Sequence, residues 1–357
     1  MILLGSTGSI GVNTLHIARE FGLRVEALVA GKNVELLNRQ IEEFKPKLVA
    51  IGDKNLVKKV NHPNVFVGNE GILNLLENSS SPLVINALVG FMGLFPTVKA
   101  LELGKELALA NKESLVAAGA FLDTSKIVPI DSEHFGLWYL KSHRKAKRLC
   151  ITASGGAFRD TPLEKLKYMK PKDALKHPNW KMGQKITIDS ASMVNKLFEL
   201  LEARWLFKAS SYDAIIETKS IIHALIDYED GSTTAHLAGQ DMKLPIAFAL
   251  LKEVDSNILP NVDLLKIKSF EFKEIKTDRY PVWELKDTLM QNPKLGAVIN
   301  GANESMIEHF LKEKCSIIDL AKGVIKAAQK FENMLPNSIN EVYEIDKEVR
   351  EFCKKLH

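Results

Sequence analysis

The chain has 357 residues, of which 46% are apolar and 26% are charged, and its formal net charge is +4. This composition is typical of a soluble globular protein with two or three domains. The scattered lysines and arginines indicate neither a nucleic acid nor a membrane partner, although they suit an anionic small substrate. No apolar run reaches the roughly 18 residues of a membrane helix, and the opening MILLG reads as a strand, which leaves no room for a signal or transit peptide. Because Cys150, Cys315 and Cys353 fit neither a disulfide framework nor a metal-ligand spacing, we expect a reducing compartment, the cytoplasm.

The first half of the chain alternates apolar, β-rich runs with helical stretches, which predicts an α/β fold built on a doubly wound parallel sheet. Helices are expected at 34–44 and 115–122, among others. The predicted strands are 2–4, 25–30, 48–51, 83–88, 107–110, 127–130 and 149–153. Small and polar residues follow these strands in GSTGSIG, GKN, NKES, DSEH and SGG. Since the carboxyl ends of parallel strands share one edge, we expect the binding chemistry to gather there.

The second half changes character at about residue 210. Strands are predicted at 214–217, 221–227 and 233–237, with a hairpin turn at EDGS, residues 229–232. Residues 258–290 have weak periodicity and are interpreted as a connecting segment. Helices predicted at 297–311, 317–330 and 339–355 indicate a small helical C-terminal domain.

GSTGSIG, residues 5–11, lies between a predicted strand and a predicted helix and resembles a dinucleotide-binding turn. Gly5 would make the tight turn, Gly8 would let the backbone approach a pyrophosphate, and Gly11 would let the helix pack on the sheet. The helix N-terminus would offer its N–H groups to the phosphates. A simple glycine turn is the alternative. Lys32 stands near the end of the second strand, where NAD sites carry an acid, and so favours NADP through its 2′-phosphate; a solvated loop charge is the alternative there.

A metal and substrate site is predicted from carboxylates far apart in the chain. Asp131 and Glu133 follow a strand, two residues apart, and would repel each other unless a cation bridges them. Residues 185–205 are predicted to run from a strand into a helix that Asp189 or Ser190 caps. The apolar stripe of that helix is Val194, Leu197, Leu201 and Trp205, and its polar face carries Ser192, Asn195, Lys196, Glu199 and Glu202. The polar face is either solvated or lines a cleft.

If this face lines a cleft, Glu199 would complete a three-carboxylate site, whose oxygen ligands suit Mg²⁺ or Mn²⁺. Ser190, Asn195 and Lys196, at the start of the predicted helix, would suit a phosphate. Ser154, in SGG, and His177 could close around the same anion.

Taken together, the chain resembles the 1-deoxy-D-xylulose 5-phosphate reductoisomerases. The matching stretches keep the family's order and span essentially the whole chain: GSTGSIG, AGKN, LANKESLV, DSEH, TASGG with FR, HPNWKMG, the DSAS–NK–E helix with EARW, and NGANE near residue 300. The resemblance implies a doubly wound NADPH domain (1–130), an α+β catalytic domain (131–257) with a lid loop at 155–184, a connecting segment (258–290) and a small C-terminal helical domain (291–357). It also implies a homodimer, joined through the central domain.

The implied activity is the rearrangement of 1-deoxy-D-xylulose 5-phosphate, a phosphorylated ketose, and its reduction by NADPH to 2-C-methyl-D-erythritol 4-phosphate, in isoprenoid precursor biosynthesis. One divalent cation (Mn²⁺, Mg²⁺ or Co²⁺) would bind Asp131, Glu133 and Glu199. Lys112, Glu133 and His177 would be catalytic. The implied substrate-binding residues are Lys112, Ser132, Glu133, Ser154, His177, Ser190, Asn195, Lys196 and Glu199. The implied cofactor-binding residues are Thr7, Gly8, Ser9, Ile10, Gly31, Lys32, Asn33, Asn111, Glu113 and Gly183.

HPNWKMG, residues 177–183, places a tryptophan among turn formers and a positive charge. We interpret it as part of the lid, with Trp180 and Met182 folding over substrate and excluding water. The alternative is that Trp180 permanently fills a gap between domains.

Four positions depart from the family pattern: Phe135, Ala157, Leu197 and Glu217. They leave the expected ligands intact and bear on loop stiffness and rate. His134, His143 and His236 are expected to have structural or surface roles. Two other functions remain open: an ordinary NADP-dependent dehydrogenase of a phosphorylated substrate, and a redox-sensing protein that binds the nucleotide without turnover.

Overall fold

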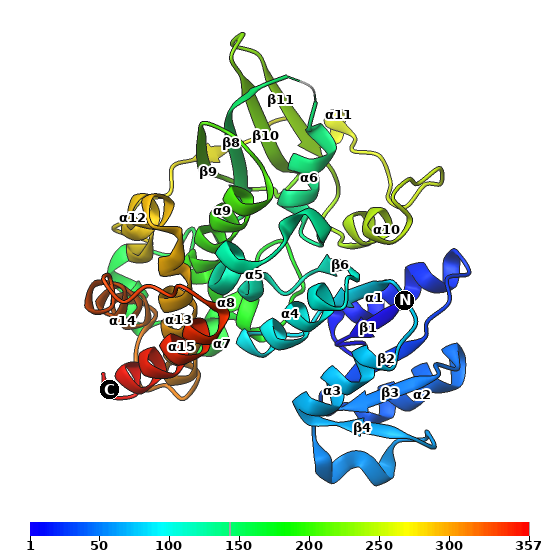
Figure 1. Ribbon diagram of the computed structural model, residues 1–357. Helices are drawn as coiled ribbons and strands as arrows, with labels where there is room; N and C mark the ends of the chain where they lie inside the picture. Colours follow the sequence, from blue (N-terminus) through cyan, green and yellow to red (C-terminus); the bar gives the residue numbers. More distant parts are fainter. Residues whose placement is uncertain (143, 357) are drawn as a thin grey trace. The chain divides into compact units, whose positions relative to one another are not determined.

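The computed structural model describes residues 1–142 and 144–356, so the expectation for His143 lies outside the described residues. Packing divides the chain into two compact units (Figure 1). The first unit comprises residues 1–114, 122–131 and 241–259, and the second comprises 115–121, 132–240 and 260–357. These units reflect contacts alone, and the boundaries of the functional domains stay a prediction.

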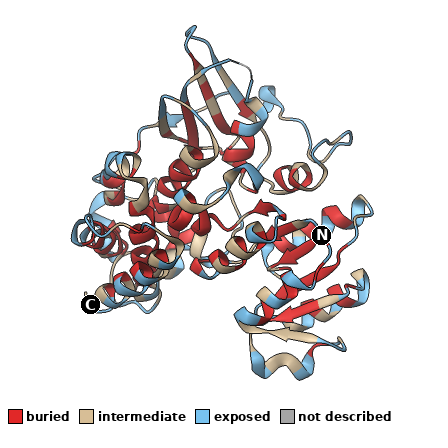
Figure 2. Ribbon diagram, viewed as in Figure 1, coloured by how far each residue is buried: buried red, intermediate tan, exposed pale blue. Residues whose placement is uncertain are grey.

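The first unit is built on a seven-stranded parallel sheet with the strand order β4-β3-β2-β1-β5-β6-β7. Its strands are β1 (Ile2–Leu4), β2 (Ala27–Ala30), β3 (Leu48–Ile51), β4 (Val65–Val67), β5 (Leu83–Asn86), β6 (Glu106–Leu109) and β7 (Ile127–Pro129). Every residue of β1 and β2 is buried (Figure 2), as expected for strands covered by helices on both faces. The predicted doubly wound sheet is therefore confirmed.

Helices cover the two faces of this sheet because the crossovers from β1 to β4 run one way across it and those from β4 to β7 run the other way. The β1–β2 and β5–β6 connections move opposite ways across the sheet. Because crossovers between parallel strands are right-handed almost without exception, this order puts α1 and α4 on opposite faces. Helix α10 packs on α1, and α3 packs on α4. The helices of this unit are α1 (Ser9–Glu20), α2 (Val34–Phe44), α3 (Gly68–Glu77), α4 (Leu94–Glu102) and α10 (Lys243–Leu251), and α5 (Lys112–Ala118) begins in it.

The second unit contains a five-stranded mixed sheet with the order β11-β10-β8-β9-β12. Strands β8 and β9 are parallel and the other neighbours are antiparallel. The strands are β8 (Ala146–Ala153), β9 (Ser211–Glu217), β10 (Ile222–Tyr228), β11 (Thr233–Leu237) and β12 (Phe272–Lys273). The predicted hairpin at 229–232 joins β10 to β11.

Helices α6 and α9 pack against this sheet, α6 on β10 and β11 and α9 on β8 and β9. Beyond residue 290, α13 is almost entirely buried against α14 and α15 (Figures 1 and 2), which confirms the helical C-terminal part. A capping box between Ser316 and Asp319 fixes the start of α14. The helices are α6 (Ser132–Leu140), α7 (Pro171–Ala174), α8 (Gln184–Ser192), α9 (Val194–Leu206), α11 (Leu264–Ile267), α12 (Lys286–Gln291), α13 (Gly296–Leu311), α14 (Ile317–Lys330) and α15 (Ile339–Cys353). Within the described residues, no helix is both long and apolar enough to cross a membrane.

Three sequence predictions need correction. The strand expected at 149–153 is β8 of the mixed sheet, so SGG does not share an edge with the loops of the parallel sheet. Strand β4 was not predicted, because three half-buried residues at a sheet edge carry little periodicity. Residues 184–192 form α8 rather than a strand, since Thr187, Ile188, Asp189 and Ala191 are buried with helical spacing.

Candidate active site

The glycine turn after β1 has the shape that a nucleotide-binding turn needs. Gly5 has a φ of 86°, and a side chain there would meet the carbonyl oxygen of Ala87 at 2.5 Å. A side chain on Gly11 would meet the carbonyl oxygen of Gly5 at 2.2 Å. Gly8 is exposed at the start of α1, and no side chain in the described residues caps this helix start. The N–H groups of the first turn therefore point to a backbone-lined position that suits a phosphate.

This turn lies where the strand order of the parallel sheet reverses. Strand β1 has β2 on one side and β5 on the other, and ligands of doubly wound sheets bind at such a point. Thr7 and Ile10 are half-buried and Ser9 is exposed. Gln40 of α2, which sequence reasoning missed, donates to the carbonyl of Ser6 at 2.9 Å and fixes the turn from below.

The predicted 2′-phosphate contact follows β2. Gly31, Lys32 and Asn33 are all exposed. The Asn33 side chain accepts the N–H of Leu36 at 3.1 Å and so caps α2. Asn33 therefore stabilises the start of α2. Lys32 is the only one of these three residues whose side chain is charged and could pair with a phosphate.

Asn111 and Glu113 are both buried, and their contact with the cofactor stays a prediction. Asn111 Nδ2 donates to Glu113 at 3.0 Å and to the carbonyls of Leu88 and Gly90 at 2.9 and 2.8 Å. The pair therefore clamps the loop that follows β5. In this loop the side chain of Val89 is 71% exposed, and Met92 just beyond it is also exposed. Neither residue was among the site residues predicted from the sequence.

The three predicted metal ligands converge. Asp131, Glu133 and Glu199 each offer one carboxylate oxygen, and these atoms lie within 4.8 Å of one another. Lys112 Nζ lies 3.2 Å from Asp131, and Lys196 bonds Glu199 and lies 3.5 Å from Glu133. Burial alone would raise the pKa of Glu133, but Lys196 and a contact with His223 outweigh it and lower that pKa to about 2.

This set of donors fits a hard divalent cation. Oxygen-only ligation suits Mg²⁺ or Mn²⁺, and three ionised carboxylates exceed the charge of two lysines by one. A divalent cation here would leave Lys112 and Lys196 available to a substrate anion. His223, 3.7 Å from Glu133, was not among the predicted site residues, and only its place in the three-dimensional fold reveals it.

Helices α8 and α9 meet at a bend in the middle of the predicted phosphate site. Met193 joins them with a φ of 70°, a backbone conformation that residues other than glycine rarely adopt. The bend starts α9 afresh at Val194, so Asn195 and Lys196 stand in its first turn. Asn195 Nδ2 donates to Glu199 at 2.6 Å, and Ser132 Oγ donates to Glu133 at 2.7 Å. The predicted polar face of α9 is buried among such contacts rather than solvated.

Ser154, His177 and Ser190 come together from three separate segments, as predicted. His177 Nε2 lies 2.9 Å from Ser154 Oγ and 3.2 Å from Ser190 Oγ. Its Nδ1 accepts the backbone N–H groups of Asn179 and Trp180, so the ring proton sits on Nε2. Burial, with the Arg159 charge nearby, lowers the pKa of His177 to about 4. Two hydroxyls and a neutral imidazole N–H therefore face one point, which suits a phosphate.

The HPNWKMG loop rests against the turn between β9 and β10. Asn179 Nδ2 donates to the carbonyl of Thr218 at 3.0 Å and to Ser220 Oγ at 2.7 Å. The Trp180 indole is half-buried, with its ring 6.3 Å from that of His223. Met182 is also half-buried, and Gly183 is exposed at the start of α8. The lid role of Trp180 and Met182 and the cofactor contact of Gly183 stay predictions.

Three of the four departures from the family pattern fall at buried positions, and the fourth falls in a turn. Phe135 is buried and packs its ring against His236 at 5.3 Å, and Leu197 is fully buried. Ala157 lies in a turn. Glu217 is also buried, and its carboxylate accepts the N–H groups of Lys219, Ile221 and Ile222, which holds the turn that carries Thr218 and Ser220.

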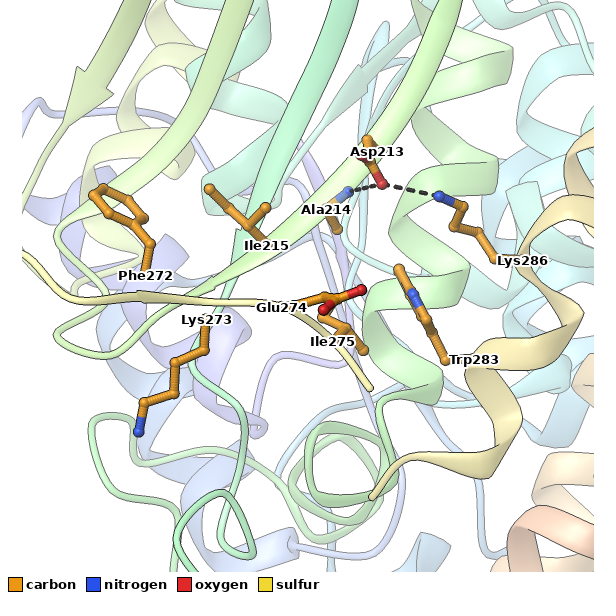
Figure 3. Close-up of a pocket in the computed structure, with 9 residues that line it drawn as sticks. All are labelled: Asp213, Ala214, Ile215, Phe272, Lys273, Glu274, Ile275, Trp283 and Lys286. Carbon is orange, nitrogen blue, oxygen red and sulfur yellow. Dashed lines mark hydrogen bonds and ion pairs between the residues drawn. The ribbon is translucent and has the colours of Figure 1, made fainter. Parts of the chain in front are cut away.

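A separate cleft of about 390 Å³ opens where β12 diverges from β9 (Figure 3). Its lining residues are Asp213, Ala214, Ile215, Phe272, Lys273, Glu274, Ile275, Trp283 and Lys286. Lys286 bonds Asp213 at 2.9 Å, and Asp213 also accepts the N–H of Ala214, so these polar groups satisfy one another. Among the described residues that line this cleft, none is a predicted site residue.

Comparison with known proteins decides the family. Three protein-family models match the chain. They describe the 1-deoxy-D-xylulose 5-phosphate reductoisomerase (residues 1–119), the 1-deoxy-D-xylulose 5-phosphate reductoisomerase C-terminal domain (127–207) and the DXP reductoisomerase C-terminal domain (237–352). The chain belongs to the 1-deoxy-D-xylulose 5-phosphate reductoisomerase family. It is 59% identical to the reductoisomerase of Nautilia profundicola, over 99% of both chains, and 53% identical to that of Wolinella succinogenes, over the whole of both.

Solved reductoisomerase structures share the fold and show what those proteins bind. One, in complex with NADPH, fosmidomycin and magnesium, aligns with a TM-score of 0.92 and 31% identity over 99% of this chain and 97% of that one. The reductoisomerase of Zymomonas mobilis, in complex with NADPH, aligns with a TM-score of 0.89 and 31% identity over 99% and 98%.

Proposed function

We propose that this chain catalyses the NADPH- and divalent-cation-dependent conversion of 1-deoxy-D-xylulose 5-phosphate to 2-C-methyl-D-erythritol 4-phosphate, a step of isoprenoid precursor biosynthesis. The observation that carries this function is the convergence of Asp131, Glu133 and Glu199, 68 residues apart at the extremes, in a member of the reductoisomerase family. A glycine turn of nucleotide-binding shape supports the use of a dinucleotide.

The three carboxylates would hold one cation, which supplies Lewis-acid polarisation of the substrate carbonyl and hydroxyl. Lys112 and Lys196 stand beside these carboxylates and hold positive charge where negative charge develops on the substrate oxygens. Glu133, with its lowered pKa, stays ionised at neutral pH and keeps its oxygens as acceptors. Ser132, bonded to Glu133, orients that carboxylate.

The phosphate end of the substrate would bind where Ser154, His177 and Ser190 converge. Each offers a hydroxyl or an N–H, and the first turn of α9 adds Asn195, Lys196 and backbone N–H groups. A neutral His177 donates from Nε2 without a proton change over the physiological range. The site thus recognises a phosphate by geometry.

NADPH would lie across the turn of residues 7–10, with Lys32 at its 2′-phosphate, and would supply the hydride. Asn111 and Glu113 act through the loop after β5, which they clamp. Trp180 and Met182 would close over the substrate and exclude water, which strengthens every electrostatic contact in the site. The half-buried indole supports such a movement, because part of its apolar surface is still open to be covered.

A homodimer in the cytoplasm is the proposed setting. Trp138 and Tyr139 on α6 are 41% and 56% exposed, and neighbouring exposed aromatic side chains are typical of a subunit interface. The three cysteines are free, and Cys150 and Cys353 are buried, which suits a reducing compartment. Sedimentation of the purified protein tests the oligomeric state.

The decisive assay follows NADPH oxidation on addition of deoxyxylulose phosphate, with and without EDTA. We expect oxidation that EDTA abolishes and that Mg²⁺ or Mn²⁺ restores, with methylerythritol phosphate as the product. An ordinary dehydrogenase would oxidise NADPH without metal and leave the carbon skeleton unchanged. A redox sensor would bind NADPH and show no turnover, and either outcome would refute the proposed function.

A further inference from the structure

A buried carboxylate stands immediately before Ser190 in α8. Asp189 is 1% exposed. One of its oxygens accepts from Lys185 Nζ at 2.8 Å, one helical turn earlier, and the other accepts from Asn303 Nδ2 at 2.7 Å. Because an ionised carboxylate is tolerated inside a protein only when its oxygens are bonded, these contacts are structurally required. Asn303 lies on α13, so a charge-assisted hydrogen bond ties α8 to α13.

The orientation of α8 decides where Ser190 points. In an α-helix adjacent residues project in different directions, so Asp189 faces α13 while Ser190 faces His177. The other side of α8 is closely packed, since a side chain on Gly156 would meet the Ser190 carbonyl oxygen at 2.5 Å. Helix α8 is nine residues long and ends at the bend of Met193, so its hydrogen bonding does not continue into α9. The bond between Asp189 and Asn303 is therefore one of the contacts that hold α8 in its orientation.

Helix α13 is a firm support for this contact. It is 16 residues long and packs on both α14 and α15. Gly296, Asn300 and Asn303 fall on one face of it, four and three residues apart. A side chain on Gly296 would meet the carbonyl oxygen of Val116 at 2.1 Å, so this face approaches its neighbours closely. Asn303 is fully buried on this face.

We propose that Asn303 is a positioning residue of the substrate site. Acting through Asp189, it sets the rotation of α8 and thereby places Ser190 Oγ at the point that His177 Nε2 also reaches. This inference rests on the proposed function, in which Ser190 binds the substrate phosphate. The competing explanation is that the contact between Asn303 and Asp189 only stabilises the fold.

The test compares Asn303→Ala with Asn300→Ala. Asn300 is the matched control: it is the same residue type on the same face of α13, equally buried, and neither amide atom has a hydrogen-bond partner among the described residues. Asn303→Ala is expected to raise the KM for deoxyxylulose phosphate about tenfold, with kcat and the KM for NADPH changed less than about twofold. Asn300→Ala is expected to leave all three within about twofold. Thermal unfolding of both variants measures any loss of stability separately.

A double-mutant cycle with Ser190→Ala tests whether Asn303 acts through Ser190. If it does, the KM of Ser190→Ala/Asn303→Ala equals that of Ser190→Ala alone, because the group being positioned is already gone. The proposal would be overturned if the KM increases of the two single variants multiplied in the double variant. It would also be overturned if Asn303→Ala had the wild-type KM. Inactive wild-type protein would instead refute the proposed function, so the two failures are distinguishable.

A reciprocal exchange keeps the test decisive if Asn303→Ala does not fold. In Asp189→Asn/Asn303→Asp the amide and the carboxylate change places. The hydrogen bond between positions 189 and 303 and the net charge are retained, and Lys185 Nζ then donates to an amide oxygen in place of a carboxylate. Asn303→Asp alone brings a carboxylate oxygen to the place of Asn303 Nδ2, which lies 2.7 Å from Asp189, and is expected to raise the KM at least about tenfold at a pH at which both carboxylates are ionised. The exchange is expected to return the KM to within about threefold of wild type. A double variant no better than Asn303→Asp would contradict the proposal.

Discussion

His177 accepts the backbone N–H of Trp180 at 2.8 Å through its Nδ1 atom. This contact joins the end of the phosphate site to the loop that carries the indole. It also fixes the tautomer, because an accepting Nδ1 leaves the ring proton on Nε2, next to Ser154 and Ser190.

The first prediction concerns the protonation of this ring. Burial lowers the pKa of His177 to about 4 from its usual 6.5, so the Nε2–H tautomer should persist down to about pH 5 in a nitrogen NMR titration. Since the pKa is lower in the folded protein, this histidine's contribution to stability is complete above pH 6.5 and is lost as the pH falls toward 4. A His177→Gln variant identifies the signal, and a ring that titrates near pH 6.5 would contradict the structure.

The second prediction concerns movement of the loop. Trp180 is one of four tryptophans in the chain, and deoxyxylulose phosphate should change the protein's fluorescence as the indole becomes covered. Trp180→Phe should remove this change while keeping most of the substrate affinity. If the change persists in the variant, the signal comes from another tryptophan. If wild type shows no change, Trp180 is fixed and fills a gap permanently.

The third prediction concerns the cation. Glu199→Gln removes one of three converging carboxylates and should weaken Mn²⁺ binding at least about 100-fold, measured by electron paramagnetic resonance of free Mn²⁺ without substrate or cofactor. Glu202→Gln, one turn along α9 and outside the converging set, is the control and should bind Mn²⁺ nearly normally. Equal affinities in the two variants would place the cation elsewhere.

The fourth prediction concerns cofactor choice. Lys32→Ala should raise the KM for NADPH about tenfold and leave the KM for NADH nearly unchanged, because only NADPH carries the 2′-phosphate. Lys47→Ala is the matched control, since Lys47 is also exposed but precedes β3, at the opposite edge of the sheet. A parallel rise for both cofactors would mean that Lys32 supports the fold rather than the phosphate.

The fifth prediction concerns stability in acid. Burial would raise the pKa of Glu26, but hydrogen bonds from Ser79, Ser80 and Ser81 outweigh it and lower that pKa from 4.5 to about 2. The carboxylate therefore contributes about 3 kcal/mol to the free energy of unfolding at pH 7, which is present above pH 4.5 and lost as the pH falls toward 2. Glu26→Gln should be less stable than wild type in urea at pH 7, with the difference shrinking below pH 4.5. The exposed Glu42→Gln should be neutral at both pH values.

The sequence predicted most of the helices and strands from the spacing of their apolar residues. It predicted most of the convergent site from polar residues that follow the strands or begin the helices. Helices α2 and α14 match their predicted ranges because both carry a clear helical stripe and a capping residue, Asn33 and Ser316. The start of 185–205 reads as a strand because Ile186, Thr187 and Ile188 are β-branched. A helix forms there instead, because its buried residues pack with helical spacing. Local propensity was overridden by tertiary packing.

The sequence alone could not predict which side chains contact each other in the folded protein. His223 and Gln40 stand in unremarkable stretches and gain their roles only from contacts with Glu133 and Ser6, far away in the chain. The hydrogen bonds from Asn111 to the loop after β5 could not be predicted either, because the sequence does not show whether an asparagine is buried or exposed. Backbone strain at Met193 also leaves no trace in composition.

The first unit is assembled from stretches that leave the ribosome at very different times. Its core includes Ile246, Ala247 and Ala249 of α10, packed with Leu15 and Ile17 of α1. Until synthesis passes residue 249, the growing chain exposes an apolar surface on its earliest helix, although that helix was complete more than 200 residues before. Nascent chains stalled between these points should leave the first unit open to proteases, whereas chains that extend past α10 should protect it.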